Sequence, residues 1–308
     1  MNHKIILTKI FIIFAFLCII LKPAIAFNAT ITGLRLWALT VLPGLFPALV
    51  ATSFILKVFP MKNASSYIYI IAAGILCGFP IGAMLCGQIH KQNKDEFISE
   101  NIMAFCNISS PSFIINYIIN ESLKNIFPCV IVLMCVYLPV IECIIFLLLK
   151  YKNAIFTKHT GSSETVRNTI KDKSDDSDSC KLTVILDNIM TSSVKSMLKL
   201  GAYIVAFSCI AAYIYEFPFM SITLKSIVCG ITEITNGIYL CSSLNINNTA
   251  KIILITAVNA FGGISTLMQT ISMINNTGIK IKKYIHNKII FTAVTVVNTL
   301  FIMYIFYK

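Results

Sequence analysis

The stretch GILCGFPIGAMLCGQIH, residues 74–90, is apolar enough for a membrane but is interrupted at its centre by Gly78, Pro80 and Gly82. Proline removes a backbone donor, and glycine permits dihedral angles that other residues avoid. In hydrocarbon an unpaired backbone group is costly, so non-helical backbone persists only inside protein or beside a wet cavity. We interpret the stretch as a broken helix. A simple kink is the alternative, because Gly and Pro are common in membrane helices.

The composition is that of a membrane protein. Of the 308 residues 57% are hydrophobic and 12% are charged, which departs far from the average of soluble proteins. A spanning helix needs about 20 mostly apolar residues, and roughly nine segments reach or approach that length. These segments are residues 5–21, 36–59, 64–90, 102–119, 126–149, 197–215, 219–240, 251–274 and 284–307.

Several classes of function lack support in the sequence. The net charge of +12 is spread over short loops, which indicates membrane topology rather than binding of nucleic acid. The 11 Cys include no C-x-x-C pair and the 4 His lie singly, so we expect no metal site and no disulfide framework. Nucleotide-binding P-loop, H-E-x-x-H and G-x-S-x-G motifs are absent, and we expect neither an enzyme nor a cofactor.

The distribution of polar residues divides the chain. The apolar run near the N-terminus precedes Lys22 and Pro23, which favours an uncleaved helix over a cleaved signal peptide. One long polar insert separates two apolar halves of similar length, which suggests a duplication. The expected parts are a signal-anchor helix (1–26), a first repeat (27–150), a polar cytoplasmic linker (151–196) and a second repeat (197–308).

The two halves can be aligned weakly through their interrupted segments. GFPIG (78–82) corresponds to EITNG (233–237), and AFCNISSPSF (104–113) corresponds to AFGGISTLMQ (260–269). Each half then has an early helix, a segment interrupted by Gly, a segment with a polar break and a closing helix. This order predicts two related repeats.

The positions of the lysines bear on the topology. If all nine segments span, the N-terminus and the insert lie on opposite faces, against the positive-inside rule. The conflict disappears if the third and seventh segments re-enter, bent at Gly78–Gly82 and near Asn236–Gly237. We therefore expect an all-α polytopic membrane protein of two inverted repeats with about seven spans and two re-entrant segments, nine spans being the alternative. The cytoplasmic lysines are then Lys57, Lys62, Lys91, Lys94, those of the insert, Lys280, Lys282, Lys283 and Lys288.

Four interrupted segments carry polar residues at membrane depth. Intramembrane polar groups are costly and usually face the protein interior or a cavity, so four matched clusters predict a site between the repeats. The clusters are Gly78, Pro80 and Gly82; Asn107, Ser109, Ser110 and Pro111; Glu233, Thr235, Asn236 and Gly237; and Gly262, Gly263, Ser265 and Gln269.

Glu233 is the costliest of these groups to bury. It is a candidate proton carrier, sodium ligand or substrate partner, and the alternative is that it only caps a half-helix. Backbone carbonyls beside Asn107 and Ser265 are another candidate for a sodium site. Glu142 is a second intramembrane carboxylate, but no polar cluster surrounds it.

Five ordered motifs resemble those of the YlbJ-like sporulation integral membrane proteins. That family is similar to the nucleoside-recognition, or Gate, domain group and to concentrative nucleoside transporters. The resemblance covers about residues 33–300 apart from the insert. The motifs are GLRLWALTVLPGLFPALVATSFIL (33–56), GFPIGAML (78–85), FCNISSPSFI (105–114), GITEITNGI (230–238) and GGISTLMQ (262–269).

The resemblance implies two Gate-like repeats with substrate-binding residues at the breaks. It also implies passage of dipicolinate, a small aromatic dicarboxylate, across the membrane around the developing spore. Two positions depart from the family pattern, which usually has Lys at Met84 and Phe at Ala48. The implied substrate-binding residues are Gly78, Pro80, Gly82, Asn107, Ser110, Pro111, Glu233, Asn236, Gly237, Gly262, Gly263, Ser265 and Gln269.

Together these features predict a transporter of a small polar or anionic metabolite that acts in endospore formation. The expected partners are the substrate, a coupling H⁺ or Na⁺ and the lipid bilayer, with a homo-oligomer left open. The alternative is a membrane assembly or signalling protein of sporulation that has kept the fold without transport.

Overall fold

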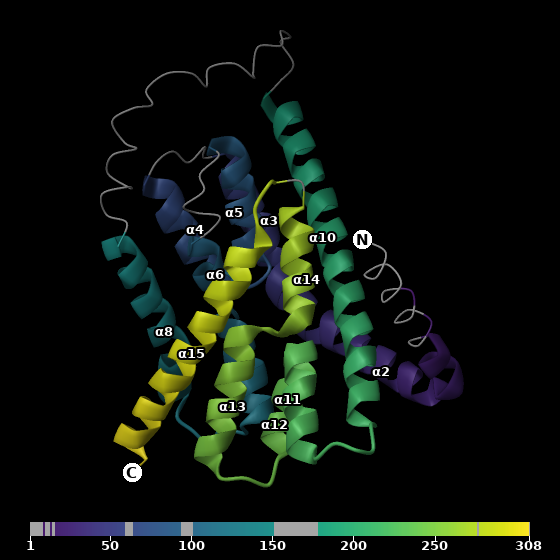
Figure 1. Cartoon of the computed structure of the whole chain (residues 1–308). Coiled ribbons are helices and arrows are strands. Elements are labelled where there is room, and N and C mark those ends of the chain that lie inside the picture. The colour runs from purple at the N-terminus through teal and green to yellow at the C-terminus, as the bar shows by residue number, and fades with distance from the viewer. Residues whose placement is uncertain are drawn as a thin grey trace.

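The computed structural model describes Lys9, Ile13 and residues 16–58, 64–93, 101–150, 178–275 and 277–307. Half of the expected anchor helix (1–26) and residues 151–177 of the expected linker lie outside this range. The described residues form helices and no β-strand (Figure 1). In chain order the elements are α2 (Pro23–Leu36), the π-helix η1 (Trp37–Val41), α3 (Leu42–Val58), α4 (Ala64–Cys77), α5 (Ile81–Asn93), α6 (Met103–Cys106), α7 (Pro111–Phe113), the π-helix η3 (Ile114–Ser122), α8 (Cys129–Lys150), α10 (Asp178–Tyr215), α11 (Ile222–Thr232), α12 (Ile234–Ser243), α13 (Asn248–Phe261), α14 (Gly263–Ile274) and α15 (Ile281–Phe306).

Five helices in the described residues are long and apolar enough to cross a membrane. The prediction of an all-helical membrane fold is therefore confirmed. The first of these helices begins at Pro23, earlier than the expected start at residue 36, because proline is well suited to the first turn of a helix. The five run over Pro23–Ile55, Cys129–Lys150, Thr183–Tyr215, Asn248–Ile274 and Ile281–Phe306.

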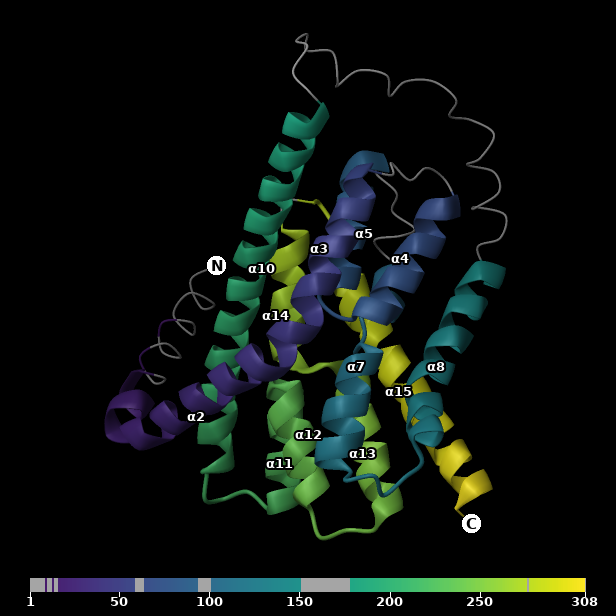
Figure 2. The same cartoon turned by 180° about the vertical axis from the view of Figure 1, so that it is seen from behind.

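Two pairs of short helices form hairpins at opposite ends of the molecule. Helices α4 and α5 pack together, and their free ends both lie at the upper end in Figures 1 and 2. Helices α11 and α12 pack together with both free ends at the lower end. The tips of both hairpins therefore reach the middle of the molecule.

Local sequence explains each hairpin tip. Gly78 ends α4 with φ 80°, a left-handed conformation that glycine adopts without strain, and Pro80 precedes the start of α5. In the second hairpin Glu233 is extended, at φ −145°, and its side chain caps α12. The break thus lies at Glu233 and not near Asn236–Gly237, where the sequence analysis placed it. Gly237 lies inside α12, where it allows close packing instead.

Two other helices are interrupted but continue in the same direction. Helix α6 ends at Cys106, and after four non-helical residues α7 begins at Pro111 and leads into η3. Ser110 caps α7 by accepting a hydrogen bond from the amide of Phe113 at 3.3 Å. Helices α13 and α14 are separated by Gly262, whose φ is 83°. Each break lies near the middle of the molecule (Figure 1).

Long helices flank the interrupted ones. Helix α15 packs against α8 and α13, and α10 packs against α2, α3 and α11 (Figures 1 and 2). Helix α10 begins at Asp178, so residues 178–196 continue as helix into the second half of the chain. The sequence analysis assigned these residues to the linker because their polar composition conceals a face that packs on the neighbouring helices.

Candidate functional site

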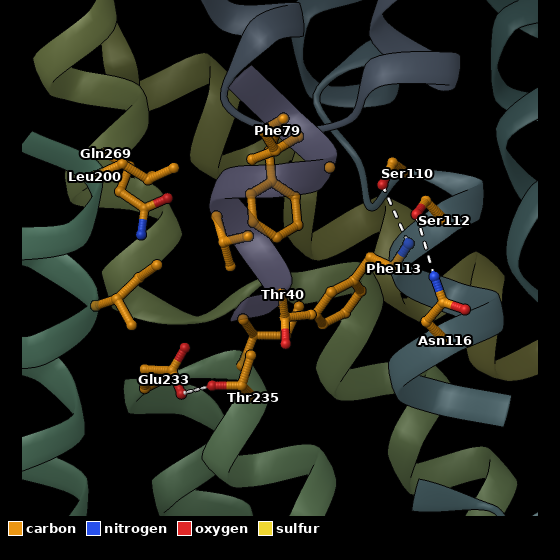
Figure 3. A pocket seen from close by; sticks show the side chains of 15 residues that line it. Thr40, Phe79, Ser110, Ser112, Phe113, Asn116, Leu200, Glu233, Thr235 and Gln269 are labelled. Atoms are coloured by element: carbon orange, nitrogen blue, oxygen red, sulfur yellow. Dashed lines mark hydrogen bonds between the residues drawn. The ribbon is translucent and has the colours of Figure 1, made fainter. Parts of the chain in front are cut away.

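A cavity lies where the two hairpin tips approach the interrupted helices. Its volume for water-sized spheres is about 60 Å³, enough for a few water molecules. Its walls come from η1, α3, both hairpin tips, α7, η3, α10 and α14 (Figure 3). The lining residues are Thr40, Val41, Gly44, Leu45, Phe79, Ser110, Ser112, Phe113, Asn116, Leu200, Ile204, Glu233, Ile234, Thr235 and Gln269.

Four residues of the predicted polar clusters line this cavity, and they come from three of the four clusters: Ser110, Glu233 with Thr235, and Gln269. Ser110 belongs to the first interrupted helix, Glu233 to the tip of the second hairpin and Gln269 to α14. Figure 3 shows them on different walls of the same space. The fourth cluster contributes Phe79, the neighbour of Pro80. The structure thus brings together segments that are far apart in the sequence.

Glu233 combines a structural role with exposure to the cavity. It is only 1% exposed to solvent, and one carboxylate oxygen, Oε2, accepts every hydrogen bond recorded for the side chain. The donors are the Asn236 amide at 2.8 Å, Asn236 Nδ2 at 3.0 Å and the Thr235 hydroxyl. The other oxygen, Oε1, points toward the cavity (Figure 3). Glu233 therefore caps α12 and leaves one acceptor available to a ligand.

Gln269 also has an unused acceptor. Its Nε2 donates to Ser265 Oγ at 3.1 Å, which fixes the amide plane on α14. Its Oε1 is buried and has no hydrogen-bond partner in the described residues. An unpaired buried acceptor is costly, so such a group is a candidate for ligand binding. Ser265 is fully buried and orients Gln269 rather than lining the cavity.

Asn107 connects the two halves of the chain at the first break. Its Nδ2 donates to Thr270 Oγ1 at 2.9 Å and to Tyr284 OH at 3.0 Å, and its Oδ1 accepts from the Ala83 amide at 3.3 Å. Ser109 adds a second connection, because its hydroxyl donates to Asn259 Oδ1 at 2.6 Å. Asn107 does not line the cavity; its side chain instead holds the first break against α5, α14 and α15.

The remaining predicted residues allow close packing or shape the breaks. A Cβ at Gly78 would approach the Ser110 amide nitrogen to 2.6 Å, and one at Gly82 would approach the Cys106 carbonyl to 2.4 Å. Each hairpin tip thus presses on the break of its own half of the chain. None of these residues is among those that line the cavity: Gly78, Pro80, Gly82, Pro111, Asn236, Gly237, Gly262 and Gly263.

Several cavity residues were missing from the prediction. Ser112 and Asn116, whose side chains are joined by a 3.3 Å hydrogen bond, line one wall, and Thr40 comes from η1. Asn116 follows Ser112 by four residues, so the two share a helix face, and that spacing could have revealed them. Thr40 carries no such signal, because the π-helix that points it inward is not evident from the sequence.

Lys288 is also placed differently from the prediction. The sequence analysis assigned it to a cytoplasmic loop, but it is 4% exposed within α15, and that assignment is wrong. Its Nζ donates to the Asn107 carbonyl at 2.9 Å and to the Ala260 carbonyl at 3.3 Å. The period was visible in the sequence: the buried face of α15 includes Tyr284, Lys288, Phe291, Thr295, Thr299 and Ile302.

A second, larger space lies between α3, α5, α10 and α14. We call it the vestibule; its volume for water-sized spheres is about 750 Å³. A gap with no room for a water molecule adjoins the vestibule and shares Leu49, Met84, Ser196 and Met273 with it; we call this gap the constriction. The constriction is lined by Leu49, Pro80, Ile81, Met84, Ser196, Met197 and Met273. The vestibule is lined by Leu49, Ser53, Met84, Gln88, Ser192, Ser193, Lys195, Ser196, Leu198, Lys199, Ser272 and Met273.

The second intramembrane carboxylate lies away from these spaces. Glu142 accepts a hydrogen bond from Asn298 Nδ2 at 2.7 Å, between the exposed sides of α8 and α15. It is not among the residues that line the cavity or the vestibule. Among the described residues no group of three or more His, Cys, Asp or Glu is placed to hold a metal ion.

The fold and the cavity define an integral membrane protein with interrupted polar helices at its centre. The chain is similar to the sporulation integral membrane protein YlbJ of Bacillus subtilis strain 168. The two are 23% identical over 319 residues, which cover 89% of this chain and 76% of the relative. No protein-family model and no solved structure matches the chain.

Proposed function

We propose that this protein transports a small polar or anionic metabolite across a membrane and acts in endospore formation. The observation that carries the proposal is the central cavity, which is lined by Ser110, Glu233 and Gln269 at hairpin tips and helix breaks. Breaks in membrane helices are where transporters bind substrates and coupling ions. The similarity to a sporulation integral membrane protein supports the role in sporulation.

The proposed architecture is a pair of inverted, Gate-like repeats, as in the group related to nucleoside transporters. It is supported by the order of elements: an early helix, a hairpin, an interrupted helix and a closing helix occur twice. The first hairpin has its free ends at the upper end of the molecule and the second at the lower end (Figure 1). The proposed motion is a rocking of one repeat against the other.

The polar groups of the cavity favour a ligand with an anionic end. The beginning of α7, capped by Ser110, presents the positive end of a helix that continues through η3 to Ser122. Ser112 and Asn116 add hydrogen-bonding groups on that wall. A carboxylate is stabilised there. The resemblance implies a dipicolinate-like dicarboxylate, which is a substrate of this class.

The opposite wall suggests how a second carboxylate is accommodated. Glu233 Oε1 points toward the cavity, and two carboxylates at short range repel one another unless they share a proton. We therefore propose H⁺ as the coupling ion at Glu233. The cavity of about 60 Å³ is too small for an aromatic dicarboxylate, so the structure corresponds to a closed conformation in this proposal. Substrate would enter from the vestibule when the constriction opens.

Uptake into proteoliposomes tests this function. The purified protein should accumulate labelled dipicolinate saturably when an inward proton gradient is imposed, and a labelled nucleoside assayed in parallel should accumulate weakly. Glu142→Gln is the matched control, because it removes an intramembrane carboxylate that lies away from the cavity. It should transport like the wild type. Accumulation of the nucleoside and not of dipicolinate would support transport but contradict the proposal of a dicarboxylate substrate.

A folded protein that moves neither compound would favour the assembly or signalling alternative. Shortening the insert is a further test that distinguishes a transporter from an assembly or signalling protein. Replacing residues 160–175 by a short Gly/Ser linker should leave the flux of a transporter nearly unchanged, because the halves need only a tether. Loss of sporulation with normal amounts of protein in the membrane would favour the assembly protein.

A further inference from the structure

Lys288 lies where two interrupted helices end. Asn107 is the C-cap residue of α6 and Gly262 that of α13, and Lys288 Nζ donates to one carbonyl at each helix end: Asn107 O at 2.9 Å and Ala260 O at 3.3 Å. The ring of Phe291 lies 5.3 Å away on the same helix. Lys288 thus contacts the first half of the chain and the second half through a single side-chain nitrogen.

These carbonyls need a donor or a cation. The last four carbonyls of a helix have no partner within the helix, and they carry the negative end of its dipole. At membrane depth no bulk water is present to satisfy them. Unwound carbonyls of this kind are also the groups that coordinate Na⁺ in broken-helix transporters. The site is therefore suited to any small monovalent cation.

The carbonyl of Asn107 is held in place independently of Lys288. The Asn107 side chain donates to Thr270 and Tyr284 and accepts from the Ala83 amide, so its backbone cannot turn away easily. The next two carbonyls have other donors: Ile108 O accepts from the Phe79 amide at 2.7 Å, and Ser109 O accepts from the hydroxyl of Tyr137 at 3.0 Å. The acceptors around Lys288 thus persist when the lysine side chain is removed.

We propose that Lys288 is a built-in cation that fills an alkali-cation site between the two interrupted helices. The Asn107 and Ala260 carbonyls form the site, and the ammonium occupies the position that Na⁺ would take. The natural chain then binds no Na⁺ at this point, which excludes the sodium site considered beside Asn107. Shortening the side chain should open the site to Na⁺. This inference does not rest on transport, and it is tested without it.

The test measures thermal unfolding of the purified full-length protein in NaCl and in choline chloride at equal ionic strength. The wild type should unfold at the same temperature in both salts. Lys288→Ala should unfold at a lower temperature in choline and recover with increasing Na⁺ in a saturable manner. Lys288→Met fills the space without charge and should be destabilised in both salts. Ile302→Ala creates a cavity elsewhere on the same helix face and should show no recovery with Na⁺.

Two results would overturn the proposal. One is a Lys288→Ala protein that responds to none of Li⁺, Na⁺ and K⁺, and the other is a wild type with the same Na⁺ response as the variant. If Lys288→Ala aggregates in choline, its monodisperse fraction is compared by size exclusion after purification in NaCl and in choline throughout. A larger fraction in NaCl supports the site, and equal fractions contradict it.

Discussion

At the residue scale, the two carboxylate oxygens of Glu233 have different roles: one caps α12, and the other faces the cavity. Its Oε2 receives all three recorded hydrogen bonds at the start of α12, whereas Oε1 points toward the cavity. A glutamine can place its single oxygen on the same three donors and direct its Nε2 toward the cavity. An alanine can do neither. Substitution by glutamine therefore removes only the charge of Glu233, whereas substitution by alanine removes both the helix cap and the charge.

The first prediction uses this difference. Glu233→Gln should fold normally but lose accumulation driven by a proton gradient, while exchange of labelled for unlabelled substrate persists. Glu233→Ala should lose the cap, which typically costs about 1 kcal/mol, and unfold at a lower temperature. Uptake at several pH values and thermal unfolding measure the two effects. Unchanged accumulation by Glu233→Gln at every pH would remove Glu233 from the coupling.

The second prediction concerns Gln269, whose Oε1 lacks a partner. Gln269→Leu removes a costly unpaired acceptor but also the hydrogen bond to Ser265 Oγ, so the two effects oppose each other and stability should change by no more than about 1 kcal/mol. Substrate binding should weaken roughly tenfold, as expected for the loss of one hydrogen bond that the amide oxygen accepts from a protonated group of the substrate. Binding to purified protein and thermal unfolding measure both. A clear loss of stability together with normal binding would show that Gln269 is structural only.

The residues of the site were only partly predictable. Ser110, Glu233 and Gln269 were found because polar groups at membrane depth are costly and need a reason. Lys288 was misplaced because lysines near a helix start were assigned to a loop by the positive-inside rule. Lys288 lies on the buried face of α15 nevertheless, because its Nζ donates to two carbonyls, which offsets the cost of burying the side chain.

At the element scale, the second hairpin depends on one close crossing. A Cβ added at Gly237 would meet the Gly230 Cα at 2.1 Å, far inside contact distance. Gly237→Ala should therefore separate α11 from α12 and lower the unfolding temperature, whereas Gly230→Ala should act on α13, because its Cβ would meet the Val258 side chain at 2.7 Å and Gly237 Cα only at 3.5 Å. Gly44→Ala is the control, because its Cβ would lie 4.0 Å from Ser112 Oγ and alanine favours helix. Equal stability of Gly237→Ala and Gly44→Ala would contradict a tight hairpin.

The presence of the interrupted helices was predicted better than the residues at which they begin and end. Glycine and proline marked the first hairpin correctly, because no other residues take the backbone of Gly78 and Pro80 as readily. The second break was displaced to Asn236–Gly237, since glycine was taken as a breaker where it serves a close crossing. An N-cap glutamate such as Glu233 gives a weaker signal, because glutamate is also a good helix former.

At the scale of the whole molecule, both hairpins open toward opposite ends, and the lysines are distributed unequally between those ends. Single cysteines at Lys91 and Lys283, in a background without reactive cysteines, should be labelled from the face that carries the insert. Cysteines at Phe219 and Ile246 should be labelled from the other face. Labelling of positions 91 and 283 from opposite faces would mean that the α4–α5 segment spans. The upper helix ends carry Lys57, Lys91, Lys150, Lys280, Lys282 and Lys283.

The sequence alone did not determine how the helices of the whole molecule pack together. Hydropathy and charge locate apolar segments and their sidedness, but they do not say which tips meet. The cavity depends on packing between segments that are distant in sequence, such as Phe79, Gln269 and Leu200. That packing depends on the shapes of side chains in three dimensions, which no periodicity in the sequence describes.

The constriction has a chemical consequence beyond its shape. Three of its members, Met84, Met197 and Met273, are thioethers, which peroxide converts to polar sulfoxides. An oxidant that reaches the vestibule would therefore turn a dry barrier into one that water can wet. Mild peroxide treatment should make liposomes that contain the protein leak small solutes, and methionine sulfoxide reductase should reverse the leak. Leucine at positions 84 and 273 should prevent it, so cells that lose reductase activity would lose the barrier without losing the protein.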